Sequence, residues 1–164
     1  MSEAQSIQVP RPDDVEDVLG ALLGRTVTAK RLPPGDKVHG AGVVGGYFDE
    51  SGALRALIWT ERQLVTAAGG ALSMIPSGAV EDANDEGEIP ETMFDNYREI
   101  LNIFASMFND KRQRAEHVRL KEVTSTSESA DQVAAFEESA SKRLDISVVV
   151  AGGYGGGGLA VIVR

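Results

Sequence analysis

The sequence predicts a single α+β domain in which a mostly antiparallel sheet has long helices packed beside it. Two observations support this fold class. Apolar residues recur at helical spacing in three segments, and β-branched residues gather in short segments bounded by turn residues. Hydrophobic residues make up 42% of the 164 residues and charged residues 25%, which excludes a disordered or fibrous chain. The domain is expected to span residues 1–164, with residues 1–12 flexible.

The N-terminal part is expected to form a helix, a strand and a hairpin. Residues 13–23 place apolar side chains at helical spacing behind two acids, and Gly24 follows where a helix often ends. Residues 26–32 are predicted to form a strand. A hairpin is expected over residues 41–59, with its turn at residues 49–52.

The middle of the chain is expected to contain two helices separated by a loop. Thr60 and Gln63 have the spacing of a capping box, which predicts a helix that must end before Pro76. The acids within residues 81–91, together with a glycine and a proline, predict a surface loop. A long helix is then expected over residues 90–109.

The C-terminal part is expected to complete the sheet. Residues 117–123 predict a strand, residues 124–129 a polar loop, and residues 131–141 a short surface helix. Two further strands, residues 146–151 and 159–163, are predicted to form a hairpin around a glycine-rich loop.

Composition excludes several classes of function. The net charge of -9 would repel nucleic acid and an anionic membrane surface, so neither is expected as a partner. The absence of cysteine excludes disulfides and thiolate chemistry and fits a cytoplasmic location. A membrane span over residues 146–163 is an alternative, because those 18 residues carry no charge. Six glycines favour the hairpin, since lipid would leave their backbone unsatisfied.

The sequence supports none of the familiar catalytic motifs considered below. Neither His39 nor His117 has a second histidine at metal-binding spacing, so no metal site is predicted. Glycines within residues 153–158 match a dinucleotide-binding fingerprint, but no helix follows to hold a pyrophosphate. Ser51 and Ser77 lack the surroundings of a nucleophile elbow.

The long helix carries the most informative pattern. One side is apolar, and this stripe comprises Phe94, Tyr97, Ile100, Leu101, Phe104, Met107 and Phe108. The opposite side forms a polar ridge of Asp95, Glu99, Asn102, Ser106 and Asn109, at spacings of 4, 3, 4 and 3. A solvated helix face is the alternative interpretation. The ridge has no lysine or arginine at i+4 from its acids, and it places asparagine in a helix interior; both features favour a functional surface.

Asp95, Glu99 and Asn102, separated by three and two residues, resemble the active-site motif of the CheC/CheX/FliY family of chemotaxis phosphatases. Ala105 stands where that family's helix often carries a small residue. The flanking order is also similar: a hairpin, a helix, an acidic loop, the motif helix and a strand pair. The resemblance covers residues 38–163 and implies a CheX-like single domain with the family's α+β fold.

The resemblance implies a phosphatase in two-component signalling that acts on the aspartyl phosphate of a response-regulator receiver domain. In this role Asn102 would orient the attacking water and Glu99 would pair with a lysine of the receiver, while Asp95 and Ser106 would contact the partner. No cofactor of its own is implied, because the receiver would supply Mg²⁺.

Two departures keep a second interpretation open. Ser125 stands where the family motif has a proline, and Ser106 where a glycine is common. The alternative is a non-catalytic protein-interaction module of the same fold in a signalling or switch complex. A homodimer is a further expectation, with the hydrophobic hairpin of residues 146–163 as the candidate sheet edge.

Overall fold

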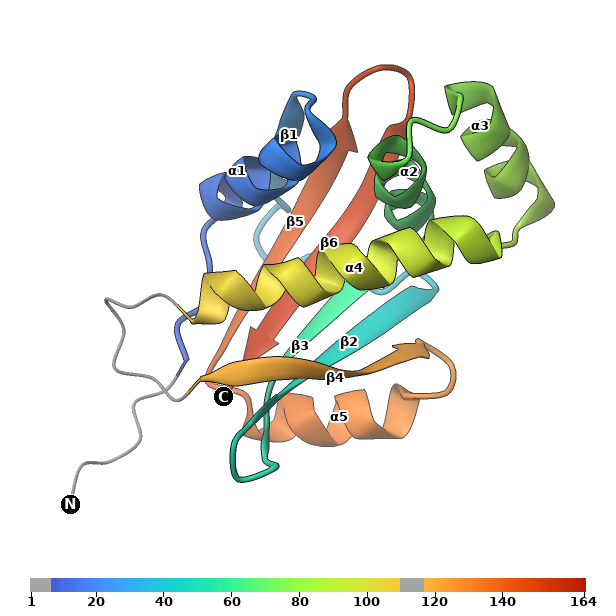
Figure 1. Cartoon of the computed structure of the whole chain (residues 1–164). Coiled ribbons are helices and arrows are strands. Elements are labelled where there is room, and N and C mark those ends of the chain that lie inside the picture. Colours follow the sequence, from blue (N-terminus) through green and yellow to red (C-terminus); the bar gives the residue numbers. More distant parts are fainter. Residues whose placement is uncertain (1–6, 110–116) are drawn as a thin grey trace.

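The computed structural model describes residues 7–109 and 117–164, which form a six-stranded sheet with helices on both faces (Figure 1). The helices are α1 (Pro12–Leu23), α2 (Arg62–Leu72), α3 (Ser77–Glu86), α4 (Glu91–Phe108) and α5 (Ala130–Ser139). The strands are β1 (Val27–Arg31), β2 (Gly42–Asp49), β3 (Leu54–Glu61), β4 (Val118–Ser125), β5 (Lys142–Val150) and β6 (Gly155–Val163). The predicted α+β class is confirmed.

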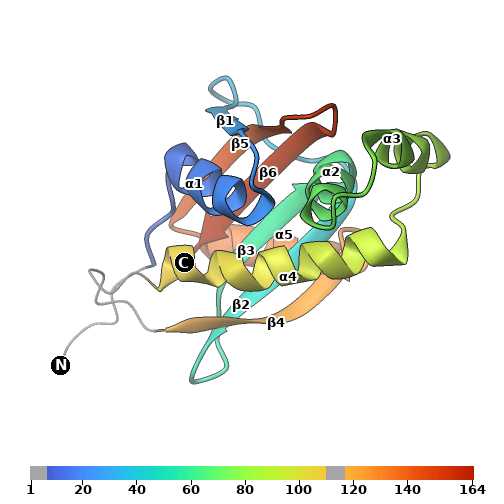
Figure 2. The same ribbon diagram turned by 45° about the horizontal axis from the view of Figure 1, so that its top comes forward.

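The strand order is β1-β5-β6-β3-β2-β4, and all neighbours are antiparallel. Helices α1, α2 and α4 cover one face, whereas α5 packs on the other (Figures 1 and 2). The terminal hairpin of β5 and β6 lies inside the sheet, so it offers no free edge. The expected dimer surface on residues 146–163 is therefore wrong, because β1 and β4 are the edge strands. The homodimer itself stays a prediction.

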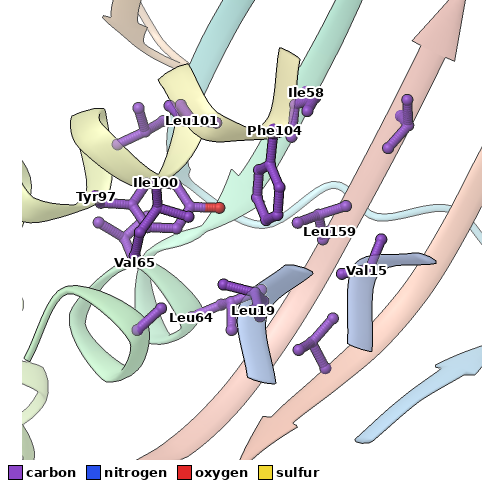
Figure 3. Packing of buried hydrophobic residues seen from close by; sticks show 14 of the residues in the cluster. Val15, Leu19, Ile58, Leu64, Val65, Tyr97, Ile100, Leu101, Phe104 and Leu159 are labelled. Carbon is purple, nitrogen blue, oxygen red and sulfur yellow. The ribbon is translucent and has the colours of Figure 1, made fainter. Parts of the chain in front are cut away.

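The main core lies between the sheet and its three-helix layer. It is built from interlocking aliphatic and aromatic side chains (Figure 3). Those seen in the close view include Val15, Leu19, Ile58, Leu64, Val65, Tyr97, Ile100, Leu101, Phe104 and Leu159. Ile7 is also buried, at 1% exposure, so the predicted flexible segment 1–12 packs on the domain at this residue. Residues 1–6 of that segment lie outside the described residues.

The predicted acidic loop at residues 81–91 is wrong, since most of it belongs to α3. Val80 and Ala83 are buried at helical spacing, which fixes one side of α3 although its other side is acidic. Gly87 then ends the helix in a left-handed conformation at φ 76°.

The capping box predicted for α2 is also wrong. The strand β3 continues through Thr60, whose side chain is buried and hydrogen bonds to the hydroxyl of Tyr97 at 2.7 Å. Glu61 occupies the N-cap position, and its carboxylate accepts hydrogen bonds from the backbone N–H groups of Gly40 and Gly158.

The glycine-rich segment is shorter as a loop than expected, because residues 155–158 belong to β6. A Cβ on Gly156 would lie 1.9 Å from the carbonyl oxygen of Val148 on β5, so only glycine allows this strand approach. None of the described helices meets the length and apolarity that crossing a bilayer requires.

Candidate functional site on helix α4

The polar ridge of α4 faces solvent. Asp95, Glu99, Asn102 and Ser106 are all exposed, while the apolar stripe on the opposite side of the helix is largely buried. The spacing of these residues therefore brings four of the five ridge side chains to one accessible helix face.

Asn109 differs from the rest of the ridge. Its side-chain amide donates a hydrogen bond to the carbonyl of Val118 at 2.8 Å and accepts one from the N–H of the same residue at 2.9 Å. This residue fastens the C-terminal end of α4 to the start of β4. Nothing in its local sequence distinguishes it from the exposed ridge residues.

Two buried tyrosines hold α4 against the sheet. The hydroxyl of Tyr47 donates to the carbonyl of Leu101, the residue that precedes Asn102, and the hydroxyl of Tyr97 pairs with Thr60. Burial, with a smaller contribution from Tyr97, raises the pKa of Tyr47 well above its ordinary value. The hydroxyl therefore stays protonated and remains a donor.

The substitution Tyr47→Phe is expected to lower the free energy of unfolding by about 1 kcal/mol, the usual net contribution of one hydrogen bond. Its ring would keep the edge contact with Phe108, whose centroid lies 5.1 Å away. Urea denaturation would measure the change. A loss above about 3 kcal/mol would contradict this account, because it would require the ring packing to fail as well.

A second set of contacts ties α4 to α2. The amide of Asn96 donates to the carbonyl of Gly69 at 2.8 Å and to the hydroxyl of Ser73 at 2.7 Å. Gly69 also lies so close to Met93 that no larger residue fits without movement. The ridge is thus carried on a helix fixed from two directions, which limits how far its side chains can be displaced.

An open groove of about 690 Å³ runs between α4 and β4. Arg98, Glu99 and Asn102 line its helical wall, and residues 120–124 line the wall formed by β4. Within residues 7–109 and 117–164, the side chains of Glu99 and Asn102 make no hydrogen bond or ion pair. Both groups are therefore available to a partner.

Ser125, which replaces the family's proline, ends β4 opposite Val43. Its hydroxyl accepts a hydrogen bond from the N–H of Glu128 at 3.2 Å, so the serine helps form the turn into α5. In the part of the chain that the structure describes, no three histidine, cysteine or acidic residues form a group able to hold a metal ion. Supply of Mg²⁺ by a partner stays a prediction.

Comparison with known proteins identifies the fold. No family model matches the chain, and no curated protein does. The FliM middle domain from Vibrio alginolyticus is similar in structure, with a TM-score of 0.62 and 14% identity over 93% of this chain and 88% of that one. A chain of the CheX–CheY–BeF₃–Mg²⁺ complex from Borrelia burgdorferi gives a TM-score of 0.57 and 12% identity, covering 93% of this chain and 94% of that one.

The chain therefore has the fold that CheX and the FliM middle domain share, over most of its length. This confirms, for the fold, the resemblance to the CheC/CheX/FliY family that the motif helix suggested. The roles of Glu99, Asn102, Asp95 and Ser106 are not determined by a fold, because one fold can carry different functions.

Proposed function

We propose that this protein is a phosphatase that hydrolyses the aspartyl phosphate of a response-regulator receiver domain. The observation that carries the proposal is the pair formed by Glu99 and Asn102. They are one helical turn apart, exposed, without partners among the described residues, and located in a groove on a firmly anchored helix.

The chemistry requires few groups from this chain. Water attacks the phosphorus in line, the bond between phosphorus and the aspartyl oxygen breaks, and phosphate and the free carboxylate are released. Such a transfer depends mainly on positioning and on charge stabilisation. The amide oxygen of Asn102 can accept a hydrogen bond from the attacking water, and its NH₂ group can donate one to a phosphoryl oxygen. The receiver supplies the phosphorylated aspartate and Mg²⁺.

Glu99 has the complementary role of docking. Its carboxylate is expected to form a charge-assisted hydrogen bond with a lysine of the receiver, which sets the register of Asn102 over the phosphoryl group. Asp95 and Ser106, one turn beyond this pair on either side, would contact the partner at the two ends of the same face.

The solved complex supports a receiver as the partner, since it joins CheX, CheY, BeF₃ and Mg²⁺ in one assembly. A partner of this class also fits the acidic chain, because a lysine and a metal ion attract it. A cytoplasmic location stays a prediction.

The direct test is a dephosphorylation assay. Receiver domains from the same organism would be phosphorylated with acetyl phosphate and Mg²⁺, and phosphate release would be followed with and without this protein. We expect catalytic acceleration with the cognate receiver. A complex that forms without any acceleration would contradict the proposal and favour the interaction module.

The substitution Glu99→Gln is expected to raise KM for the phosphorylated receiver about tenfold, since it removes one charged partner of an intermolecular hydrogen bond. The matched control is Glu138→Gln, at an exposed position of α5 on the other face of the sheet. Steady-state kinetics with both variants would measure the difference. Equal KM values for both variants would show that Glu99 does not dock the receiver.

The non-catalytic alternative has its own support. Ser125 and Ser106 depart from the family motif, and the same fold occurs in the FliM middle domain. In that case the groove would bind a partner without hydrolysis, and the exposed pair would serve recognition only.

A further inference from the structure

The groove that contains Glu99 and Asn102 carries a cation on each wall. Arg98 belongs to α4 and Lys121 to β4, and both are exposed. Within residues 7–109 and 117–164 no carboxylate pairs with either side chain. The guanidinium of Arg98 lies over the ring of Phe94, 5.3 Å from its centroid. That contact leaves the edge of the guanidinium free to bind an anion.

Arg143, on the far side of the sheet, differs from Arg98 and Lys121 because it forms ion pairs within the chain. Arg143 binds Asp145 at 2.8 Å and Glu137 at 2.8 Å, so its charge is balanced inside the molecule. Arg98 and Lys121 have no such ion pair with any described residue, although the chain as a whole is acidic with a net charge of -9. Carboxylates of a partner would pair with these two cations.

A β-bulge accounts for the place of Lys121. The register of β4 on β2 pairs Glu122 with Gly46 and Leu120 with Tyr47, which leaves Lys121 as the extra residue. Bulges bend a strand locally and redirect a side chain, often beside functional sites. Here the redirected residue lines the same groove as the motif pair.

Strand β4 carries a second basic residue, Arg119, beyond the groove. Lys121 also lines a second hollow next to the turn between β2 and β3, together with His117, Arg119 and the acids Asp49 and Glu50. The acids of α3, by contrast, lie beyond the N-terminal end of α4 (Figure 1). The two hollows therefore carry acidic and basic side chains in similar numbers, whereas α3 is acidic.

We propose that Arg98 and Lys121 bind the carboxylates that surround the phosphorylated aspartate of the receiver, and that this contact sets the affinity for that partner. The inference rests on the proposed function. A phosphoaspartyl site that uses Mg²⁺ needs carboxylate ligands, so it presents negative groups beside its lysine and its metal ion. Glu99 lines the same groove and takes the receiver's lysine. The groove lining thus carries two cations, Arg98 and Lys121, and two carboxylates, Glu99 and Glu122, which suits a partner site with groups of both signs.

The test compares Lys121→Glu with Lys30→Glu, which makes the same change at an exposed position of β1, on the opposite edge of the sheet. We expect Lys121→Glu to raise KM for the acetyl-phosphate-treated receiver about tenfold, and Arg98→Gln about threefold, with the loss falling on KM rather than on kcat. Added salt should raise the KM of the wild-type protein and reduce the difference in KM between Lys121→Glu and Lys30→Glu.

The outcomes separate this inference from the proposed function. If the wild-type protein accelerates dephosphorylation but Lys121→Glu behaves like Lys30→Glu, the cations only protect an edge strand and the inference is overturned. If nothing is accelerated, calorimetry with the receiver loaded with beryllium fluoride and Mg²⁺ decides. Weaker binding by Lys121→Glu alone would support the contact in a non-catalytic module, and equal affinities would overturn it. No binding by the wild-type protein would overturn both proposals.

Discussion

The substitution Asn102→Ala is expected to abolish most of the acceleration of receiver dephosphorylation, with a fall in kcat of about 100-fold or more. The side-chain amide is the group proposed to orient the attacking water, and alanine offers neither a donor nor an acceptor. Misplacement of a nucleophile by about 1 Å is enough to cost two orders of magnitude. Single-turnover decay of the phosphorylated receiver, with this protein in excess, would measure the step itself.

The fold should survive this change. Asn102 is exposed and makes no side-chain hydrogen bond among the described residues, and alanine is the best helix former. The matched control is Gln63→Ala, which removes an exposed side-chain amide from α2 outside the groove. Full activity is expected for that control, and unchanged far-UV circular dichroism for both variants. An Asn102→Ala protein that keeps more than half of the wild-type rate would refute the proposed role of the amide.

Periodicity in the sequence predicted the elements whose burial is strongly one-sided. Helix α4 is the clearest example, because its apolar stripe and polar ridge alternate with a helical period and the structure buries one and exposes the other. Helix α1 and its end at Gly24 were predicted for the same reason. Local sequence patterns are enough to predict an element when one of its faces packs on a large core.

The errors occurred where a distant contact decides the conformation. Helix α3 was predicted as a loop since acids dominate its composition, yet Val80 and Ala83 are enough to hold one side of it on the domain. Residues 155–158 were predicted as a loop since the glycines separate two β-branched runs and are typical of turns. Their place in β6 depends on the backbone of Val148 on the neighbouring strand, which no local pattern reveals.

In the candidate site, too, local patterns predicted some features and distant contacts determine the others. The exposure of Glu99 and Asn102 followed from helical spacing alone. The contact of Asn109 with β4 and the bulge at Lys121 depend on how two distant segments align, so the sequence could not predict them. The groove itself is a product of that alignment, since its two walls come from α4 and β4.

The substitution Gly69→Ala is expected to lower the free energy of unfolding by about 2 kcal/mol, although alanine is intrinsically the better helix former. A Cβ at Gly69 would lie 2.3 Å from the carbonyl oxygen of Met93, a backbone atom that cannot rotate away. Relief would require α2 and α4 to separate. Equilibrium urea denaturation would give the change from the shift in midpoint.

Gly78→Ala provides the matched control, because it makes the same chemical change in α3, where nothing lies within 4 Å of the new Cβ. That variant is expected to gain about 0.5 kcal/mol, since the helix propensity of alanine then acts unopposed. Opposite signs for the two substitutions would show that the close approach of α2 to α4 limits what residue 69 can be. Met93 precedes Glu99 on α4 by less than two helical turns. A displacement of α4 at Met93 should therefore also lower the phosphatase activity that depends on Glu99 and Asn102. If Gly69→Ala stabilised the protein as Gly78→Ala does, α4 would not be held by this contact, and the rigid placement of Glu99 and Asn102 would need another cause.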